Sequence, residues 1–185
     1  MNDVLFQADP FSIDSQKIYC SCEGYNISDN NFAGNLNRNW ITYYYSKFFP
    51  HVNVLQKYVG KKIICCGTII GPTAPIVDYL KWYTTINKGE VRWYSFLHKS
   101  TFRFRCMGQA LYNIYCYNNP DKCIIQNQNE GLILTCGEVD YNSVKKSPSG
   151  QLLNDKHEVY PILHQMDRWG PEKVTLLENI AMNAV

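Results

Sequence analysis

The sequence predicts an α/β fold, and three observations lead to this prediction. Residues 62–86 are typical of a short buried strand, a turn between two glycines and an amphipathic helix. Segments typical of strands and helices then alternate along most of the chain. Finally, 45% of the 185 residues are hydrophobic, which is ordinary for a globular protein and argues against disorder.

The unit at residues 62–86 is the most informative stretch. Residues 63–66 are an unbroken apolar run, as in a strand buried on both faces. Gly67 and Gly71 bracket a turn where the backbone takes a positive φ or lies close to a ligand. Thr73 and Pro75 suit the first turn of the helix that follows. Because open α/β sheets bind ligands at the carboxyl ends of their strands, this turn is the first candidate site.

Two strands and two helices are predicted before this unit. The strands lie at residues 3–6 and 18–22, and residues 23–37, rich in Asn, Ser, Asp and Gly, are interpreted as a loop. Helical spacing of apolar residues predicts helices over 40–48 and 52–59, which a following proline and glycine end.

After the unit, residues 93–104 are aromatic and basic. They suit either contacts with phosphates or sugars, or a surface segment whose basic groups reach solvent. The remaining expectations are a helix at 109–117, strands at 123–125, 132–136 and 159–163, a hairpin or exposed loop at 140–155, and a last helix from Pro171. With no internal repeat, residues 1–185 are expected to form a single domain.

Composition excludes several classes of protein. A net charge of +2 is too small to indicate nucleic acid or an acidic membrane as partner. No apolar run approaches the ~20 residues that span a bilayer, and the first residues lack the features of a signal peptide. The chain is therefore expected in the cytoplasm by default, whereas an additional upstream segment would allow the Golgi lumen.

The eight cysteines leave two interpretations open. Their even number suits disulfides, but most lie in apolar runs, where a free thiol behaves as a small buried hydrophobe. Zinc is weakly supported, because no Cys-x-x-Cys pair occurs.

Polar clusters mark several strand ends and helix starts, and together they carry a family resemblance. The stretch 2–11 holds Asp3, Asp9 and an Asp-Pro-Phe motif, and residues 164–168 read His-Gln-Met-Asp-Arg. In this order the clusters resemble the nucleotide-diphospho-sugar transferases of the GT-A type, glycosyltransferases with an acidic Asp-Pro-Phe motif and a closing His-Gln-x-Asp-Arg. Three further stretches fit the resemblance: 66–71, 108–113 and 150–154.

The resemblance implies a fold and a mode of association. It implies an incomplete GT-A-like, Rossmann-like mixed sheet flanked by helices, with residues 1–185 corresponding to the C-terminal part of such an enzyme. In this resemblance, the strands that precede the motif in the family would lie upstream of residue 1. Uncovered strand edges would then favour a homodimer or pairing with another chain.

The resemblance also implies a function, namely transfer of a sugar from a nucleotide-diphosphate donor to a hydroxyl of a glycan or protein. A divalent cation, Mn²⁺ or Mg²⁺, would neutralise the leaving diphosphate, with Asp3 and His164 as its ligands. Gln109 is the implied catalytic residue. The implied substrate-binding residues are Cys66, Gly67, Thr68, Asn113, Gln165 and Arg168.

Two departures from the family pattern keep other interpretations open. Gly108 stands where the family has an Asp, and Asn2 stands where it has an Arg. A catalytically inactive relative that acts as a sugar-binding or interaction module is therefore one alternative. Another is a small α/β module whose glycine turn binds a nucleotide phosphate, although residues 67–71 match neither common phosphate-binding glycine motif.

Overall fold

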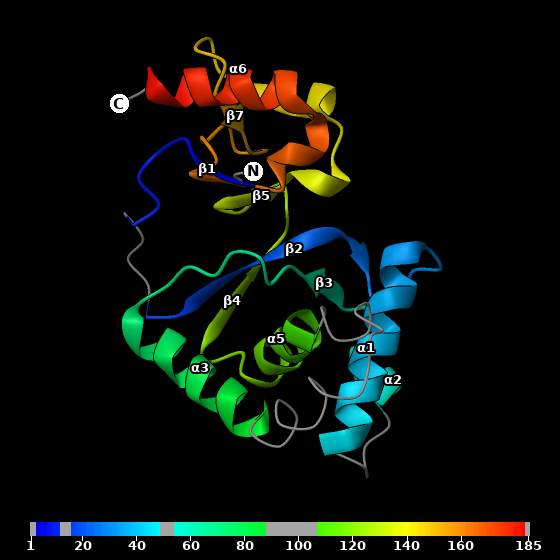
Figure 1. Cartoon of the computed structure of the whole chain (residues 1–185). Coiled ribbons are helices and arrows are strands. Elements are labelled where there is room, and N and C mark those ends of the chain that lie inside the picture. The colour runs from blue at the N-terminus through cyan, green and yellow to red at the C-terminus, as the bar shows by residue number, and fades with distance from the viewer. Residues whose placement is uncertain (1–2, 12–15, 49–53, 88–106, 184–185) are drawn as a thin grey trace, which may run out of the picture.

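The computed structural model describes residues 3–11, 16–48, 54–87 and 107–183, which form a mixed α/β structure. Two three-stranded sheets have the strand orders β1-β8-β5 and β3-β2-β4, and β6 and β7 form a two-stranded sheet (Figure 1). The elements are β1 (Val4–Phe6), β2 (Ile18–Asn26), α1 (Phe32–Phe48), α2 (Val54–Tyr58), β3 (Lys62–Ile64), α3 (Thr73–Asn87), α5 (Met107–Asn118), β4 (Cys123–Gln126), β5 (Ile133–Thr135), η1 (Cys136–Glu138), η2 (Tyr141–Ser143), β6 (Lys145–Lys146), β7 (Leu152–Leu153), β8 (Ile162–His164), η3 (Met166–Trp169) and α6 (Pro171–Met182).

The lower module in Figure 1 comprises the sheet β3-β2-β4 and helices α1, α2, α3 and α5. Strand β2 pairs in parallel with β4 and antiparallel with β3, with an irregular register after Cys22. Its core is rich in tyrosine: the Tyr79 ring lies 5.2 Å from that of Tyr112 and 5.0 Å from that of Tyr115, centroid to centroid. Such aromatic pairs add to the stabilisation from buried area alone.

The upper module comprises the sheet β1-β8-β5, the sheet β6-β7, η1 to η3 and helix α6. Strand β8 is central, antiparallel to β1 and parallel to β5. The registers place His164, the last residue of β8, opposite both Val4 and Thr135. Leu177 of α6 packs on the core of this module, as helical spacing after Pro171 predicts.

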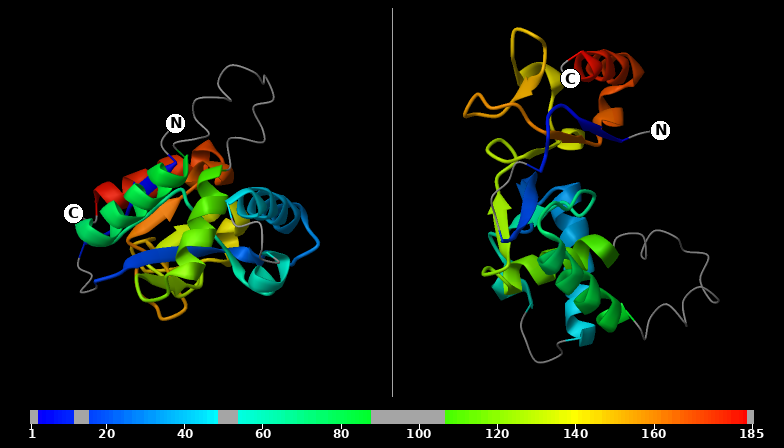
Figure 2. Two further views of the ribbon diagram at one scale, coloured as in Figure 1. Left: turned by 90° about the horizontal axis from the view of Figure 1, so that it is seen from below. Right: turned by 90° about the vertical axis from the view of Figure 1, so that its left-hand side faces the viewer.

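The two modules meet along β2, β5 and the turn after β3. The Ser21 hydroxyl of β2 donates a hydrogen bond to the Ile133 carbonyl of β5, 3.0 Å away. Ile70 of the turn packs with Ile133 and Ile162 of the upper sheet. Figure 2 shows the two modules stacked, with β2 and β4 side by side below the upper sheet.

Much of the predicted order of elements is confirmed. The strand–turn–helix unit, helices α2, α5 and α6, the strands and the polar hairpin at β6–β7 all form. The α/β class with mixed sheets and flanking helices is confirmed as well, with two separate mixed sheets. The aromatic and basic stretch at 93–104 lies outside the described residues.

The predicted loop at residues 23–37 is wrong. Strand β2 continues to Asn26 and helix α1 begins at Phe32, eight residues before the predicted start at Trp40. The polar residues here cap rather than disrupt: the Asn31 side chain accepts a hydrogen bond from the Gly34 N–H at 2.7 Å, at the start of α1. The Asp29 carboxylate likewise accepts one from the Asn26 N–H at 2.7 Å.

Within the described residues, no helix is both long enough and apolar enough to cross a lipid bilayer.

Candidate functional site at the junction of the two modules

The glycine turn after β3 lies directly against an imidazole of the upper module. A Cβ atom added at Gly67 would lie 2.2 Å from Cε1 and 2.3 Å from Nε2 of His164. Neither Gly67 nor Gly71 has a positive φ, so close approach rather than backbone conformation is what requires glycine at position 67. The sequence-predicted turn and the sequence-predicted histidine are therefore in contact.

The carboxylate of Asp3 faces the same imidazole. Asp3 Oδ2 lies 3.9 Å from His164 Nε2, and the two side chains are 55% and 5% exposed, respectively. The pairing of β1 with β8 brings these residues together, and the Gln165 N–H donates to the Asp3 carbonyl at 2.6 Å. The two predicted metal ligands, 161 positions apart in the sequence, are thus neighbours at the junction.

The other ring nitrogen of His164 faces a thiol. Cys65 Sγ lies 3.5 Å from His164 Nδ1. Burial and the neighbouring charge of Glu23 raise the pKa of Cys65 to about 12, so the thiol is neutral at pH 7. Burial lowers the pKa of His164, against smaller opposing effects of Asp3 and Asp167, so the imidazole is neutral too. We call Asp3, Cys65, Gly67 and His164 the junction site.

A buried carboxylate next to the junction site escaped the sequence analysis. Glu23 of β2 is 9% exposed, and its Oε1 accepts a hydrogen bond from Gln109 Nε2 at 3.0 Å. Burial raises its pKa, while the hydrogen bond from Gln109 has a smaller opposing effect. One signal was present in the sequence, since Glu23 is a charged residue directly after the predicted strand at 18–22, which contains none.

Gln109, the predicted catalytic residue, is at the centre of a polar network. Its Nε2 also reaches Asn37 Oδ1 at 3.2 Å, and its Oε1 accepts from the Cys66 thiol at 3.7 Å. Gly108 lies beside it, where an added Cβ would be 3.8 Å from Cys66 Sγ. The region next to Gly108 therefore holds a carboxylate, but it comes from Glu23.

Asn113 has a structural contact for each of its amide atoms. Its Oδ1 accepts from the Ile64 N–H at 2.8 Å, and its Nδ2 donates to the Ile64 carbonyl at 2.8 Å and the Gln109 carbonyl at 2.9 Å. The side chain is fully buried. In this structure it fixes the end of β3 against α5, and so positions the turn that carries Gly67.

The other predicted substrate-binding residues lie around the same turn and the end of β8. Thr68 Oγ1 is buried without a hydrogen-bond partner in the described part of the chain. Gln165 has a left-handed backbone (φ 59°), and its amide oxygen lies against Gly137. Arg168 is exposed, and its charge is near enough to contribute to lowering the pKa of His164.

Two motif residues behind the family resemblance have structural roles. Gln7 is buried; its Nε2 donates to the Tyr160 carbonyl at 3.0 Å, and its Oε1 accepts from the Leu152 N–H at 2.9 Å. Asn154 Oδ1 accepts from the N–H groups of Lys156 and Glu158. These side chains join β1, β7 and the loop after β7, so these parts of the motifs stabilise the upper module.

The junction site offers two oxygen or nitrogen donors to a cation. In the described part of the chain, the one group of three or more close metal-binding side chains is Cys20, Cys116 and Cys123, in the lower module. A surface hollow lined by Ile27, Ser28, Arg38 and Val59 is separate from the junction site. We therefore take the contact between Asp3 and His164, which neither of these features includes, as the centre of the candidate site.

Comparison with known proteins adds no relative: no family model, no characterised protein and no solved structure matches this chain.

Proposed function

We propose that the chain binds a nucleotide-diphosphate sugar at the junction site, through a divalent cation held by Asp3 and His164, as in a GT-A-like glycosyltransferase. The observation that carries this proposal is the 3.9 Å separation of Asp3 Oδ2 and His164 Nε2 beside Gly67. The family resemblance selected the same two residues from the sequence alone, and nothing in their positions along the chain requires them to meet.

The donor atoms suit Mn²⁺ or Mg²⁺. Each ligand would lie about 2.1 Å from the ion, and neighbouring ligands of an octahedral ion would then lie about 3.0 Å apart. Two donors 3.9 Å apart can share the ion after a shift of about 1 Å, which the exposed side chain of Asp3 can make. The imidazole is neutral at pH 7, which is the form that binds metal. In the tautomer with its hydrogen on Nδ1, this N–H would donate to Cys65 Sγ, 3.5 Å away, and the lone pair of Nε2 would be available to the ion. When bound, the cation would neutralise the charge of the leaving diphosphate.

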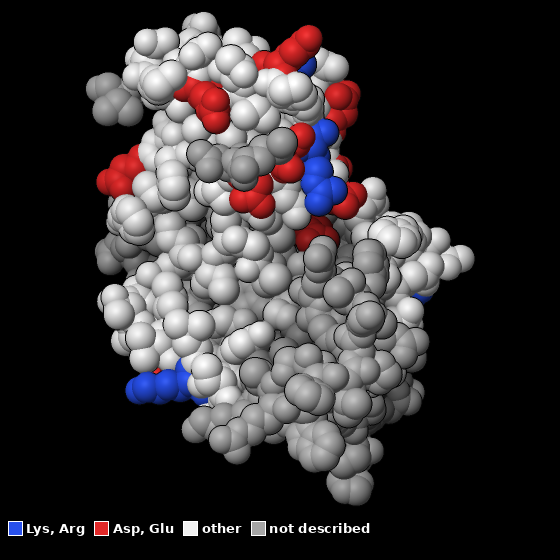
Figure 3. Space-filling model, viewed as in Figure 1, with Lys and Arg blue, Asp and Glu red and all other residues white. Residues whose placement is uncertain are grey.

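Two protein ligands are sufficient for this kind of site. Mg²⁺ in phosphate-transfer sites is commonly held by one or two carboxylates, with substrate phosphates and waters as the other ligands. Asp3 is half exposed and therefore accessible to a bound ion. On the face shown in Figure 3, acidic and basic side chains gather over the upper module and its border with the lower one. A diphosphate near these acidic groups needs a cation between them.

The Glu23–Gln109 pair lies next to the proposed cation site and supplies a carboxylate for the sugar. Cys65 connects the two clusters, because it contacts His164 and its pKa is raised in part by Glu23. Gln109 holds the Glu23 carboxylate in place, and Asn37 and Cys66 hold Gln109. We assign to Glu23 the position of the carboxylate that Gly108 lacks, beside the sugar rather than beside the cation.

Titration of a UDP-sugar and a GDP-sugar, each with and without Mn²⁺, tests the proposal by calorimetry. We expect binding that depends on Mn²⁺ and falls at least about tenfold in His164→Ala, because one of two protein ligands is lost. His157→Asn is the matched control: His157 is exposed, has a positive φ that asparagine tolerates, and should leave binding unchanged.

The same titration separates the alternatives. Sugar binding that does not depend on Mn²⁺ would indicate a non-catalytic sugar-binding module. Binding of a nucleoside triphosphate without any sugar preference would indicate a phosphate-binding turn. Unchanged Mn²⁺-dependent binding in His164→Ala would contradict the assignment of His164.

A further inference from the structure

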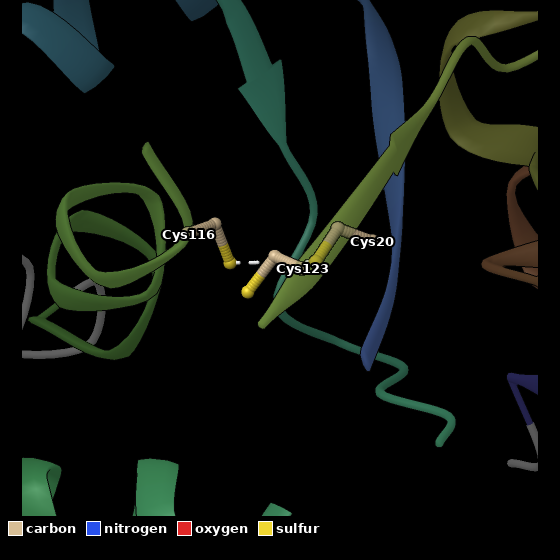
Figure 4. Close-up of side chains that lie close together, drawn as sticks. All are labelled: Cys20, Cys116 and Cys123. Atoms are coloured by element: carbon tan, nitrogen blue, oxygen red, sulfur yellow. Dashed lines mark hydrogen bonds between the residues drawn. The ribbon is translucent and has the colours of Figure 1, made fainter. Parts of the chain in front are cut away.

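Three cysteines from separate elements converge inside the lower module. Cys20 lies in β2, Cys116 in α5 and Cys123 at the start of β4, and all three are buried (Figure 4). Their sulfur atoms all lie within 4.8 Å of one another, and Cys20 Sγ is 3.4 Å from Cys116 Sγ. We call these residues the cysteine triad.

The strand register and the helix produce this arrangement. The parallel pairing sets Cys123 opposite Ile18, two residues before Cys20, so both cysteines project from the same face of adjacent strands. Helix α5 covers that face and presents Cys116 near its C-terminal end. Three chain segments therefore each contribute one thiol to one point.

We propose that the cysteine triad binds one thiophilic metal cation with a filled d shell, Zn²⁺ or Cu⁺, as thiolates. Zinc–thiolate bonds of about 2.3 Å in tetrahedral geometry place sulfur atoms about 3.8 Å apart. In the triad, Cys20 Sγ and Cys116 Sγ are 3.4 Å apart and no pair of sulfurs is more than 4.8 Å apart, so small shifts give this spacing. Thiolates select these soft cations over Mg²⁺ and Ca²⁺.

The surroundings of the triad suit a bound cation. The Tyr112 hydroxyl donates to Cys20 Sγ at 3.3 Å, an outer hydrogen bond of the kind that orients thiolate ligands. The cysteines are reduced, since a disulfide would bring two sulfurs to about 2.05 Å. Bound metal would join β2, β4 and α5 and stabilise the lower module, because the unfolded chain lacks the site.

The site is distinct from the one proposed at the junction. It has sulfur donors, is closed to solvent and lies within one module, so its expected role is structural. The absence of a Cys-x-x-Cys pair, which argued against zinc in the sequence, does not apply when three ligands come from three elements.

Metal content and thiolate ligation test the proposal in the full chain. We expect reduced protein to take up one equivalent of Zn²⁺, and to give thiolate-to-cobalt charge-transfer absorption when Co²⁺ replaces it. Competition with a Cu⁺ chelator distinguishes the two cations. Cys116→Ala should weaken Zn²⁺ binding more than about tenfold. Cys22→Ala is the matched control, because Cys22 is buried in the same strand but is not in the triad.

Other outcomes would overturn the proposal. These are no stoichiometric metal, equal binding by Cys116→Ala and the parent chain, or a disulfide between two triad residues in protein isolated without reductant. Should Cys116→Ala fail to fold, alkylation of the parent chain replaces it. In urea below the unfolding midpoint, where transient opening exposes the buried thiols, Zn²⁺ should slow the labelling of Cys20, Cys116 and Cys123 by a maleimide, and labelling of all three at the same rate with and without Zn²⁺ would contradict the proposal.

Discussion

The junction site and the cysteine triad differ in the three properties that decide what a cation site does. The junction site joins two modules, carries oxygen and nitrogen donors, and has an exposed carboxylate. The cysteine triad lies within one module, carries only sulfur and is buried. A site with open positions suits an ion that also binds a substrate, whereas a closed site suits an ion that stabilises the fold.

The two sites also differ in how well the sequence predicts them. Asp3 and His164 stand in motifs with recognisable neighbours, so the sequence can pair them. The triad depends on the register of β2 with β4 and on the packing of α5, which no local pattern encodes. Substitutions that affect one region and not the other can therefore test whether the two sites are independent.

The largest effect on stability is expected from Asn113→Ala. The substitution leaves the buried N–H and C=O of Ile64 without partners, at a cost of about 3 kcal/mol in the free energy of unfolding. Urea denaturation measures this loss. Asn179→Ala, on the exposed face of α6, is the control and should cost less than about 0.5 kcal/mol. Equal losses in the two variants would show that Asn113 does not fix the turn.

Gly67→Ala should cost about 1–3 kcal/mol, because the new methyl group overlaps the His164 ring. The ring is held by Cys65 and faces Asp3, so it cannot simply move away. Thermal denaturation measures the loss. Gly24→Ala is the control, since its nearest neighbour would lie 3.9 Å away, and it should be close to neutral. A neutral Gly67→Ala would mean that the turn and the imidazole are not in contact.

Glu23→Gln should change how stability depends on pH. The folded-state pKa of Glu23 lies above its ordinary value of 4.5. Between pH 4.5 and this raised pKa, the folded state therefore holds a proton that the unfolded state has lost. Stability from this group is complete below pH 4.5 and is lost as pH rises through the raised pKa. The variant should therefore be relatively more stable at pH 8 than at pH 5. Urea melts at both values check this, with the exposed Glu130→Gln as control; the same pH dependence in the Glu23 variant and the parent would contradict it.

Asp3→Asn should have the smallest effect on stability, within about 0.5 kcal/mol, because its carboxylate is half exposed and 3.9 Å from the imidazole. Mn²⁺ affinity should nevertheless fall, whereas Zn²⁺ uptake by the cysteine triad should not change. Parallel titrations with the two metals measure both. A loss of Zn²⁺ uptake would show that the two sites are not independent.

The sequence predicts best where glycine, proline and apolar spacing act together. The stretch from Ile63 to Pro75 contains all three signals, and β3, the turn and α3 follow as expected. It predicts worst at residues 23–37, where Asn and Asp favour loops by composition. There Asn31 caps α1 and Asp29 binds the end of β2, so tertiary structure reverses the local preference.

In the candidate site too, motifs predicted some residues, whereas roles that depend on tertiary contacts were missed. The family resemblance assigned Asp3, Gly67 and His164 to one site, but it did not predict the structural roles of Gln7, Asn113 and Asn154, because a polar side chain does not reveal whether its partner is backbone or ligand. Glu23 was missed because its burial and its hydrogen bond from Gln109 of α5 depend on tertiary packing, which no local sequence pattern reveals.

Pulsed electron paramagnetic resonance of bound Mn²⁺ tests the central claim most directly, because it detects a ¹⁴N nucleus in contact with the ion. With Mn²⁺ and a nucleotide-diphosphate sugar, the account predicts a coupling to one imidazole nitrogen that disappears in His164→Ala and persists in His157→Asn. A Mn²⁺ spectrum without nitrogen coupling, or with a coupling that survives in His164→Ala, would contradict it.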